Sequence, residues 1–200
     1  MTEAEWYKVT KDLIQALAWI GAVVAAAFAA FKAISEVRSS RHQRKDELRW
    51  KQANAAKEII NDLHRNNRAV NATTLLDWSE GKFHLSFEGN ERVEISYEKD
   101  VIPALSKRQS EYSELDREIV YCFDWFFYYI HLIEHYIRTK LIEFEDVEFI
   151  CRLYSKKIMR QDKLYETFMN THSYTLAIEF WKRGSVTENA PSSEGDGKFM

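Results

Sequence analysis

The sequence ELDREIVYCFDWFFYYIHLIEHYIRTKL, residues 114–141, decides the fold. Between residues 119 and 137, apolar side chains occupy nearly every face of a helix, which predicts that this helix lies at the centre of a core. Ser113 and Asp116 resemble a capping box that would start it. A membrane span is disfavoured for this stretch because ionisable groups are costly inside a bilayer. Those groups are Asp124, His131, Glu134 and His135.

The residues on either side of this helix predict a mainly α fold, a helical bundle with one β-hairpin insertion. The 200-residue chain contains only 6 glycines and 2 prolines, which favours long helices over a turn-dense all-β fold. In residues 83–97, apolar and polar residues alternate on both sides of a turn at Gly89, a pattern that predicts a hairpin. Other helices are expected over 68–78, from Asp100, over 145–160, and over 162–183 with Asp162 as N-cap and Gly184 as closing residue.

Residues 13–31, LIQALAWIGAVVAAAFAAF, contain one polar side chain, Gln15, and no charge. A helix of this length rises about 28 Å, close to the ~30 Å hydrocarbon core of a bilayer, so the run predicts a transmembrane helix. The alternative is a cleaved signal peptide with Ala27-Phe28-Ala29 as its cleavage site. That alternative is weaker, because residues 1–12, an outer leader in the leading interpretation, lack a positive n-region and the run is longer than a typical h-region.

The charges on either side of this run predict its orientation. Lys8 and Lys11 precede it, whereas seven Lys or Arg residues follow it up to position 51. The positive-inside rule therefore places the N-terminus outside a bacterial inner membrane and the rest of the chain in the cytoplasm. We interpret the basic run after the span as a topology signal that contacts anionic lipid headgroups, in preference to a nucleic-acid-binding segment. Its charged residues are Arg38, Arg41, Arg44 and Lys45.

Small residues recur along the span at steps of three and four positions. Small faces allow helices to approach closely in lipid, where association depends on packing. This stripe predicts self-association into a homo-oligomer; the alternative is that alanine is merely tolerated in the membrane. The stripe consists of Ala18, Gly21, Ala22, Ala25, Ala26, Ala29 and Ala33.

Residues 32–68 contain no Gly or Pro and carry ten Lys or Arg against five Asp or Glu, which predicts a juxtamembrane stalk helix continuous with the span. Its apolar stripe is too short to predict a coiled coil and could pack on its own domain instead. The stripe comprises Trp50, Ala53, Ala56, Ile59, Ile60 and Leu63. Residues 69–184 are expected to form a cytoplasmic helical domain, and the polar residues 185–200 a disordered tail.

The candidate catalytic residues lie on the central helix. His131, Glu134 and His135 match H-x-x-E-H, and residues four apart share a helix face, so two imidazoles could bind one metal beside a carboxylate. No third protein ligand is identifiable, and histidines hydrogen-bonded at the edge of an aromatic core are the alternative. Asp124 lies among aromatic residues and must be partnered, and we expect Tyr128 and His131 to partner it. No metal or cofactor site is predicted.

Three segments carry a resemblance to a group of small bacterial membrane proteins. They are ELRWKQANAAKEII at 47–60, TTLLDW at 73–78 and FDWFFYYIHLI at 123–133. Proteins of this group have one N-terminal span and a helical cytoplasmic domain, and they are associated with abortive infection and phage defence. The architecture is also similar to that of the membrane accessory protein of an RNA-targeting CRISPR class, which forms an oligomeric pore. The resemblance implies a defence effector that acts on the membrane, and it identifies no active residue.

These observations lead to three hypotheses about function. The first is a single-span membrane protein that self-associates and acts as a membrane-perturbing or pore-forming effector, triggered through its cytoplasmic domain. Its expected partners are the lipid bilayer, further copies of the chain, and a cytoplasmic protein or RNA-guided partner, without a strong direct nucleic-acid signal. The second is a membrane-tethered, metal-dependent hydrolase that uses the H-x-x-E-H helix. The third is a passive anchor or scaffold.

Overall fold

The computed structural model describes residues 3–78, 82–87, 92–160 and 163–188, except the side chains of 3–5, 7–14, 16, 18, 20, 160 and 185–188. The chain divides into two units, Met1–Trp50 and Lys51–Met200, and we describe each by itself. The predicted hairpin turn around Gly89, the N-cap Asp162 and residues 189–200 of the predicted tail lie outside the described residues.

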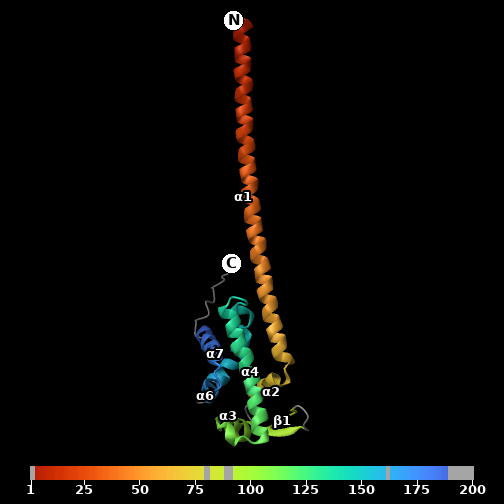
Figure 1. The fold of residues 1–200 in the computed structure, drawn as a ribbon, viewed down its shortest axis with the longest axis vertical. Coiled ribbons are helices and arrows are strands. Elements are labelled where there is room, and N and C mark those ends of the chain that lie inside the picture. Colours follow the sequence, from red (N-terminus) through yellow and green to blue (C-terminus); the bar gives the residue numbers. More distant parts are fainter. Residues whose placement is uncertain (1–2, 79–81, 88–91, 161–162, 189–200) are drawn as a thin grey trace, which may run out of the picture. The chain divides into compact units, whose positions relative to one another are not determined.

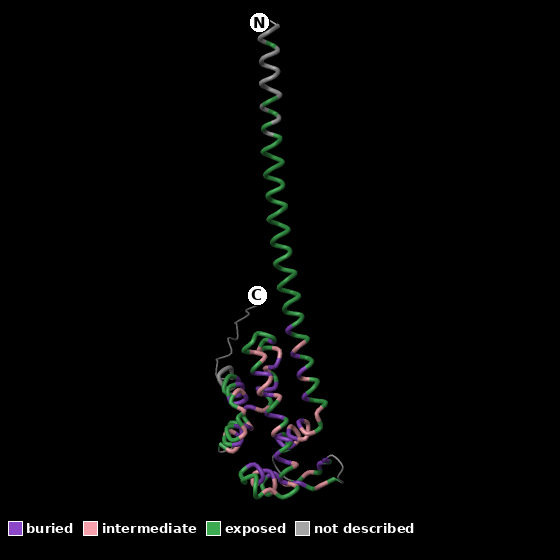
Figure 2. The backbone as a smooth tube through the Cα atoms, in the orientation of Figure 1, coloured by how far each residue is buried: buried purple, intermediate pink, exposed green. Residues whose placement is uncertain are grey.

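The first unit consists of helix α1, which spans Glu3–Arg65 and continues into the second unit. Every described side chain of residues 21–50 is exposed, as the green tube in Figure 2 shows. Within the residues that the structure describes, none of the helices combines the length and the apolar character that crossing a bilayer requires. The transmembrane helix over residues 13–31 stays a prediction, and the side chains of positions 13, 14, 16, 18 and 20 lie outside the described part, Ala18 of the small-residue stripe among them.

The second unit is mainly helical with one antiparallel hairpin, which confirms this part of the predicted fold class (Figure 1). After α1 its elements are α2 (Asn67–Asp77), β1 (Lys82–Leu85), β2 (Val93–Ser96), the π-helix η1 (Tyr97–Val101), α3 (Ile102–Ser106), the 3-10 turn η2 (Gln109–Glu111), α4 (Glu114–Arg138), the 3-10 turn η3 (Phe144–Asp146), α5 (Glu148–Arg160), α6 (Leu164–Thr171) and α7 (Thr175–Glu188).

Helix α4 is the central element of this unit, as predicted. The Ser113 side chain accepts a hydrogen bond from the Asp116 amide, and Asp116 accepts one from the Ser113 amide, which confirms the capping box. The helix packs against α2, α3 and α7 and buries an apolar face that includes Phe123, Phe126 and Phe127. Not all of the apolar faces of the helix are buried. A line of aromatic side chains on the opposite face remains exposed: Tyr121, Trp125 and Tyr128.

Residues 51–65 of α1 belong to the second unit and pack in its core, which is the alternative that the sequence left open for the apolar stripe. Ala56, Ile59 and Leu63 are buried in the core, whereas Trp50 is 67% exposed. The buried face therefore begins at Gln52, whose amide donates hydrogen bonds of 3.0 Å to the Lys140 carbonyl and the Glu143 carboxylate. The buried face of the helix consists of positions 52, 56, 59 and 63, which are spaced three or four residues apart. The predicted stripe was therefore wrong at its start, where Trp50 and Ala53 are exposed.

Asn66 separates α1 from α2, which confirms the predicted helix end. Its side chain accepts a hydrogen bond of 3.0 Å from the Ala69 amide and so caps α2. The hairpin is also confirmed, with Phe83 paired to Ile95 and Leu85 paired to Val93. Its alternation places Leu85 and Ile95 in the core, so the hairpin is stabilised by packing on the helices.

The predicted single helix over 162–183 is wrong, because the chain breaks into α6 and α7 at residues 172–174. Ser173 has a φ of 63°, in the left-handed region, and the Tyr174 amide donates to the Met169 carbonyl at 2.7 Å. This left-handed conformation is the one that glycine usually adopts at the end of a helix. Because a serine occupies the position, the sequence did not predict the end of α6.

Gly184 does not close the last helix, because α7 continues to Glu188. It lies instead where α5 and α7 pack together. A Cβ atom at position 184 would lie 2.6 Å from Cys151 Cβ and 2.7 Å from Cys151 Sγ. Only glycine therefore permits the observed distance between these helices at this point. Residues 185–188, which the sequence assigned to the tail, belong to α7.

Replacing Gly184 by alanine should destabilise the second unit. The new methyl group must displace Cys151, at a cost of about 1–3 kcal/mol for overpacking that exceeds the ~1 kcal/mol gained by alanine in a helix. Thermal unfolding of the full chain in detergent, followed by circular dichroism, should show a lower midpoint. Gly21→Ala is the matched control, because its Cβ meets nothing within 4 Å. A Gly184→Ala midpoint equal to that of Gly21→Ala would contradict the packing described.

Candidate functional site

A pocket of about 1280 Å³ lies between α3, α4 and α6 in the second unit. Its lining includes apolar side chains of these three helices and polar and charged groups from the segment between α3 and α4. The charged or titratable residues that line it are Lys107, Arg108, Arg117, Asp124 and His172. Cationic groups therefore outnumber carboxylates in the lining by at least three to one.

One wall of the pocket is fixed by an ion pair at the start of α4. Lys107 Nζ lies 2.8 Å from Asp116 Oδ2, and the same oxygen accepts a hydrogen bond of 2.7 Å from the Ser113 hydroxyl. Burial opposes ionisation of Asp116, but these hydrogen bonds outweigh it, so its pKa lies below the ordinary value. Asp116 is therefore ionised near neutral pH, and the charges of Lys107 and Asp116 balance each other.

The pocket lining also contains Asp124, which has two partners from the C-terminal part of the chain. The Tyr174 hydroxyl donates to Asp124 Oδ1 at 2.8 Å, and His172 Nδ1 lies 3.4 Å from the same oxygen. Burial disfavours the Asp124 carboxylate, but the hydrogen bonds of His172 and Tyr174 together keep its pKa below the ordinary value. The expectation that Tyr128 and His131 partner Asp124 is wrong.

The Asp124–His172 pair has the geometry of a carboxylate that orients an imidazole. Such a pair can hold a proton at the imidazole, which is the role of a general base. His172 also stacks on Phe168 with ring centroids 4.2 Å apart, so its ring is held in place. Among the described residues, however, no hydroxyl or thiol is hydrogen-bonded to His172, and the pair therefore lacks the adjacent nucleophile of a covalent mechanism.

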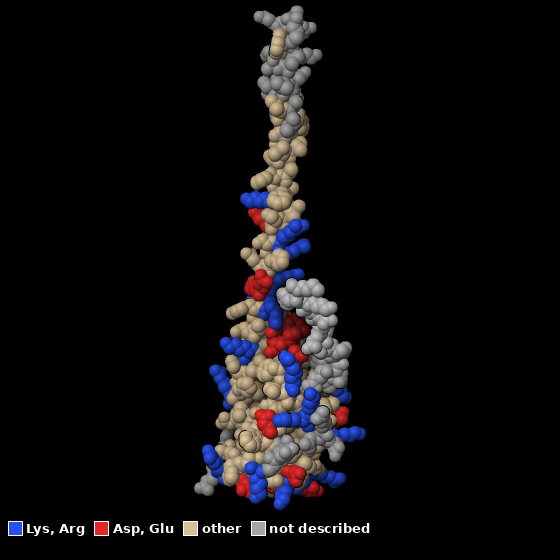
Figure 3. Space-filling view, turned by 180° about the vertical axis from the view of Figure 1, so that it is seen from behind, with Lys and Arg blue, Asp and Glu red and all other residues tan. Residues whose placement is uncertain are grey.

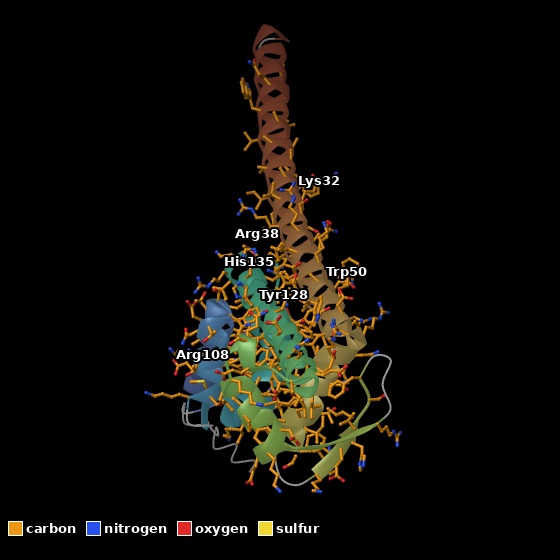
Figure 4. The ribbon with its side chains drawn as sticks, turned by 60° about the horizontal axis from the view of Figure 1, so that its bottom comes forward. Lys32, Arg38, Trp50, Arg108, Tyr128 and His135 are labelled. Carbon is orange, nitrogen blue, oxygen red and sulfur yellow. The ribbon has the colours of Figure 1, made fainter. Side chains whose placement is uncertain are left out.

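The three residues of the H-x-x-E-H motif lie on one helix but differ in how far they are buried. Glu134 is fully buried, His131 is half-buried and His135 is exposed. Tyr128 and His135 are labelled along α4 in Figure 4. Burial, followed by the effect of His135, lowers the pKa of His131, which favours its neutral form. The described residues contain no group of three or more His, Cys, Asp or Glu side chains that could hold a metal ion.

Glu134 is bound instead by arginine. Arg183 from α7 lies 2.6 Å from Glu134 Oε1, and Arg138 lies 3.5 Å from the same oxygen. The Glu134 side chain has no exposed surface, whereas that of Arg183 is 43% exposed. A carboxylate engaged in this way neutralises arginine and pairs α4 with α7, which is a structural role and not that of a free catalytic base.

The remaining predicted site residues belong to α1. The basic residues Arg38, Arg41, Arg44 and Lys45 and the small residues from Gly21 to Ala33 are all exposed. They do not line the pocket. The pocket itself was missed in the sequence, because Lys107, Arg117 and His172 come from three separate segments whose proximity no short motif indicates. The dipeptide Lys107–Arg108 beside the capping box is the one local signal that could have indicated it.

Comparison with protein-family models, with curated proteins and with solved structures found no match to this chain. The resemblance to defence-associated membrane proteins therefore stays an expectation, and the functional argument depends on the residues described above.

Arg183→Ala should strongly destabilise the fold if Glu134 has the structural role assigned to it. Removing one partner of a buried ion pair costs about 3–5 kcal/mol, and we expect about 2–4 kcal/mol here because Arg138 remains nearby. Adding Glu134→Gln should restore much of this loss, since it removes the buried charge. Chemical denaturation of the full chain in detergent measures both effects.

Arg152→Ala is the matched control for this experiment. Arg152 pairs with Glu148 at 3.5 Å on the surface of α5 and is 66% exposed, so its loss should cost less than about 1 kcal/mol. Equal stability of Arg183→Ala and Arg152→Ala would show that Glu134 does not depend on Arg183, and would return it to the list of candidate catalytic groups.

Proposed function

We propose that this chain is a single-span membrane protein that self-associates in the bilayer and perturbs the membrane when its helical domain is triggered. The span is residues 13–31, the N-terminus lies outside a bacterial inner membrane, and the helical domain lies in the cytoplasm. The observation that carries the proposal is the exposure of large apolar side chains on α1. Val24, Phe28 and Phe31 are 62%, 72% and 71% exposed.

So many exposed apolar side chains in one continuous segment are unfavourable in water and require lipid or another protein surface to cover them. Single exposed apolar residues are ordinary on a protein surface, but a continuous apolar helix is favourable only in lipid or against other apolar helices. Lipid would cover such a helix on every face, whereas a soluble helix keeps one polar face. The sequence of α1 from residue 13 to residue 31 has one polar side chain and no charge, which fits lipid.

The distribution of charge along α1 supports the same proposal. Figure 3 shows an uncharged part of the helix followed by a part where Lys and Arg side chains gather. Lys32 and Arg38, labelled in Figure 4, open that basic part, and every residue in it up to Trp50 is exposed. Cationic side chains beside an apolar segment are attracted to anionic lipid headgroups, at about 1 kcal/mol per residue.

The small-residue stripe supports self-association. Nothing lies within 4 Å of the position that a Cβ would occupy at Gly21, so this glycine is not required by packing within its own chain. Gly21, Ala22, Ala25 and Ala29 lie within one face of α1 at about 100° per residue. A second copy packed on this face would bring two helix backbones into close contact, which is how helices associate in lipid.

The alternatives receive less support. A metal-dependent hydrolase would require Glu134 to be free, and this carboxylate binds Arg183. A passive anchor would tolerate any apolar sequence in residues 13–31, so it makes a different prediction about the small-residue stripe. The role in phage defence and the formation of a pore derive from the resemblance, and both belong to the proposal.

Two glutamates at the centre of the run should abolish membrane retention. Placing Val23→Glu with Val24→Glu costs about 5–7 kcal/mol in a bilayer centre, since each acidic side chain costs about 2.5–3.5 kcal/mol. Alkaline extraction of membranes from bacterial cells that express the full chain should leave the wild type in the pellet and release the variant. Val37→Glu with Leu48→Glu, at exposed apolar positions of α1 outside the run, should stay in the pellet. Release of the wild type by alkali would overturn the proposed span.

Large residues on the small face should reduce self-association and leave membrane retention intact. Ala22→Leu with Ala29→Leu fills this face, and in-membrane cross-linking should fall from oligomer to monomer. Ala27→Leu with Ala30→Leu makes the same two substitutions outside this face and is the matched control. Equal cross-linking of the two double variants would favour the passive anchor over the self-associating protein.

A further inference from the structure

We propose that the pocket between α3, α4 and α6 binds a nucleotide, with Arg108 and Arg117 at the phosphates and Tyr112 and Tyr121 beside the base. This proposal goes beyond the membrane function and does not depend on it, since all these residues belong to the second unit. It depends on the charge balance, the aromatic lining and the volume of the pocket.

The charge balance leaves two guanidinium groups available. Lys107 is paired with Asp116, and the Asp124 carboxylate already accepts a hydrogen bond from Tyr174 and lies beside His172, so each of these groups has a partner within the chain. The Arg108 and Arg117 side chains form no hydrogen bond or ion pair with any residue that the structure describes, although both line the pocket. Two unpaired guanidinium groups on one cavity attract an anion.

The type of cation favours phosphate among anions. A guanidinium presents planar, parallel N–H groups that match two oxygens of one phosphate, and such charge-assisted bonds are stronger than neutral ones. Ser110 and Thr167 also line the pocket, and their hydroxyl groups can donate further hydrogen bonds.

The aromatic lining favours a ligand that carries a flat ring as well as phosphate. Tyr112 and Tyr121 line the pocket together with apolar side chains of α3 and α6. Tyr121 is 44% exposed, and Arg68 lies 5.1 Å from its ring centroid, which holds the ring in place. Aromatic side chains stack on nucleobases, at about 1–3 kcal/mol per base.

The volume leaves room for a ligand of this size. Pockets for drug-sized ligands measure about 300–1000 Å³, and the cavity of about 1280 Å³ is larger than an isolated phosphate requires. A nucleotide fills more of it and contacts both the arginines and the tyrosines. We therefore favour a nucleotide over free inorganic phosphate.

Titration calorimetry of the full chain in detergent, with ATP, GTP, CTP and UTP in turn, tests the proposal. We expect at least one of them to bind, and the affinity to fall at least about tenfold in the variant Arg108→Ala with Arg117→Ala, which removes two charge-assisted contacts. The affinity for inorganic phosphate and for the matching nucleoside should each be weaker than for the nucleotide. Tyr121→Ala should weaken the nucleotide and leave phosphate unchanged.

Arg92→Ala with Arg152→Ala provides the matched control, because both arginines are exposed and lie outside the pocket. This variant should bind the nucleotide as tightly as the wild type does. No binding of any of the four nucleotides would overturn the proposal. It would also be overturned by equal affinities of the two double-arginine variants, or by phosphate that binds as tightly as the best nucleotide. Circular dichroism of each variant verifies that its fold is retained.

Discussion

The buried carboxylate of Glu134 is the constraint on which the arrangement of the helical domain depends. A charge without any exposed surface must be balanced by a partner, and Arg183 from α7 provides it at 2.6 Å. The pair fixes the position of α7 along α4. Because Gly184 follows directly in the chain, the same pair also determines that α7 presents its glycine to Cys151 of α5. One ion pair thus sets how three helices meet.

Helix α4 gives the domain two different faces. Its buried face packs rings from several helices, for example Phe126 against Trp181 of α7 and Phe127 against Phe168 of α6. Its other face supplies Arg117, Tyr121 and Asp124 to the pocket. The capping box that starts α4 also holds Lys107 through Asp116. Asp116 therefore helps to start α4 and also positions Lys107 in the pocket wall. The fold and the candidate site share these contacts.

The sequence predicted those features that local patterns determine. The hairpin followed from alternation around glycine, the start of α4 from Ser113 and Asp116, and the end of α1 from Asn66. It did not predict contacts between distant segments. Glu134 meets a residue 49 positions away and Asp124 meets one 50 positions away, so neighbours along the helix were the wrong partners to expect. The break at Ser173 was missed because a serine there adopts the left-handed conformation typical of glycine.

The two thiols of the chain have a practical consequence. Cys122 and Cys151 are free and buried, and burial raises the pKa of each to about 12. Since the thiolate is the reactive form, both are inert toward electrophiles at neutral pH while the fold is intact. These are the only cysteines in the sequence. A cysteine introduced on the exposed part of α1 would therefore be the single site for a spectroscopic or chemical label, and the natural chain already serves as the unlabelled background.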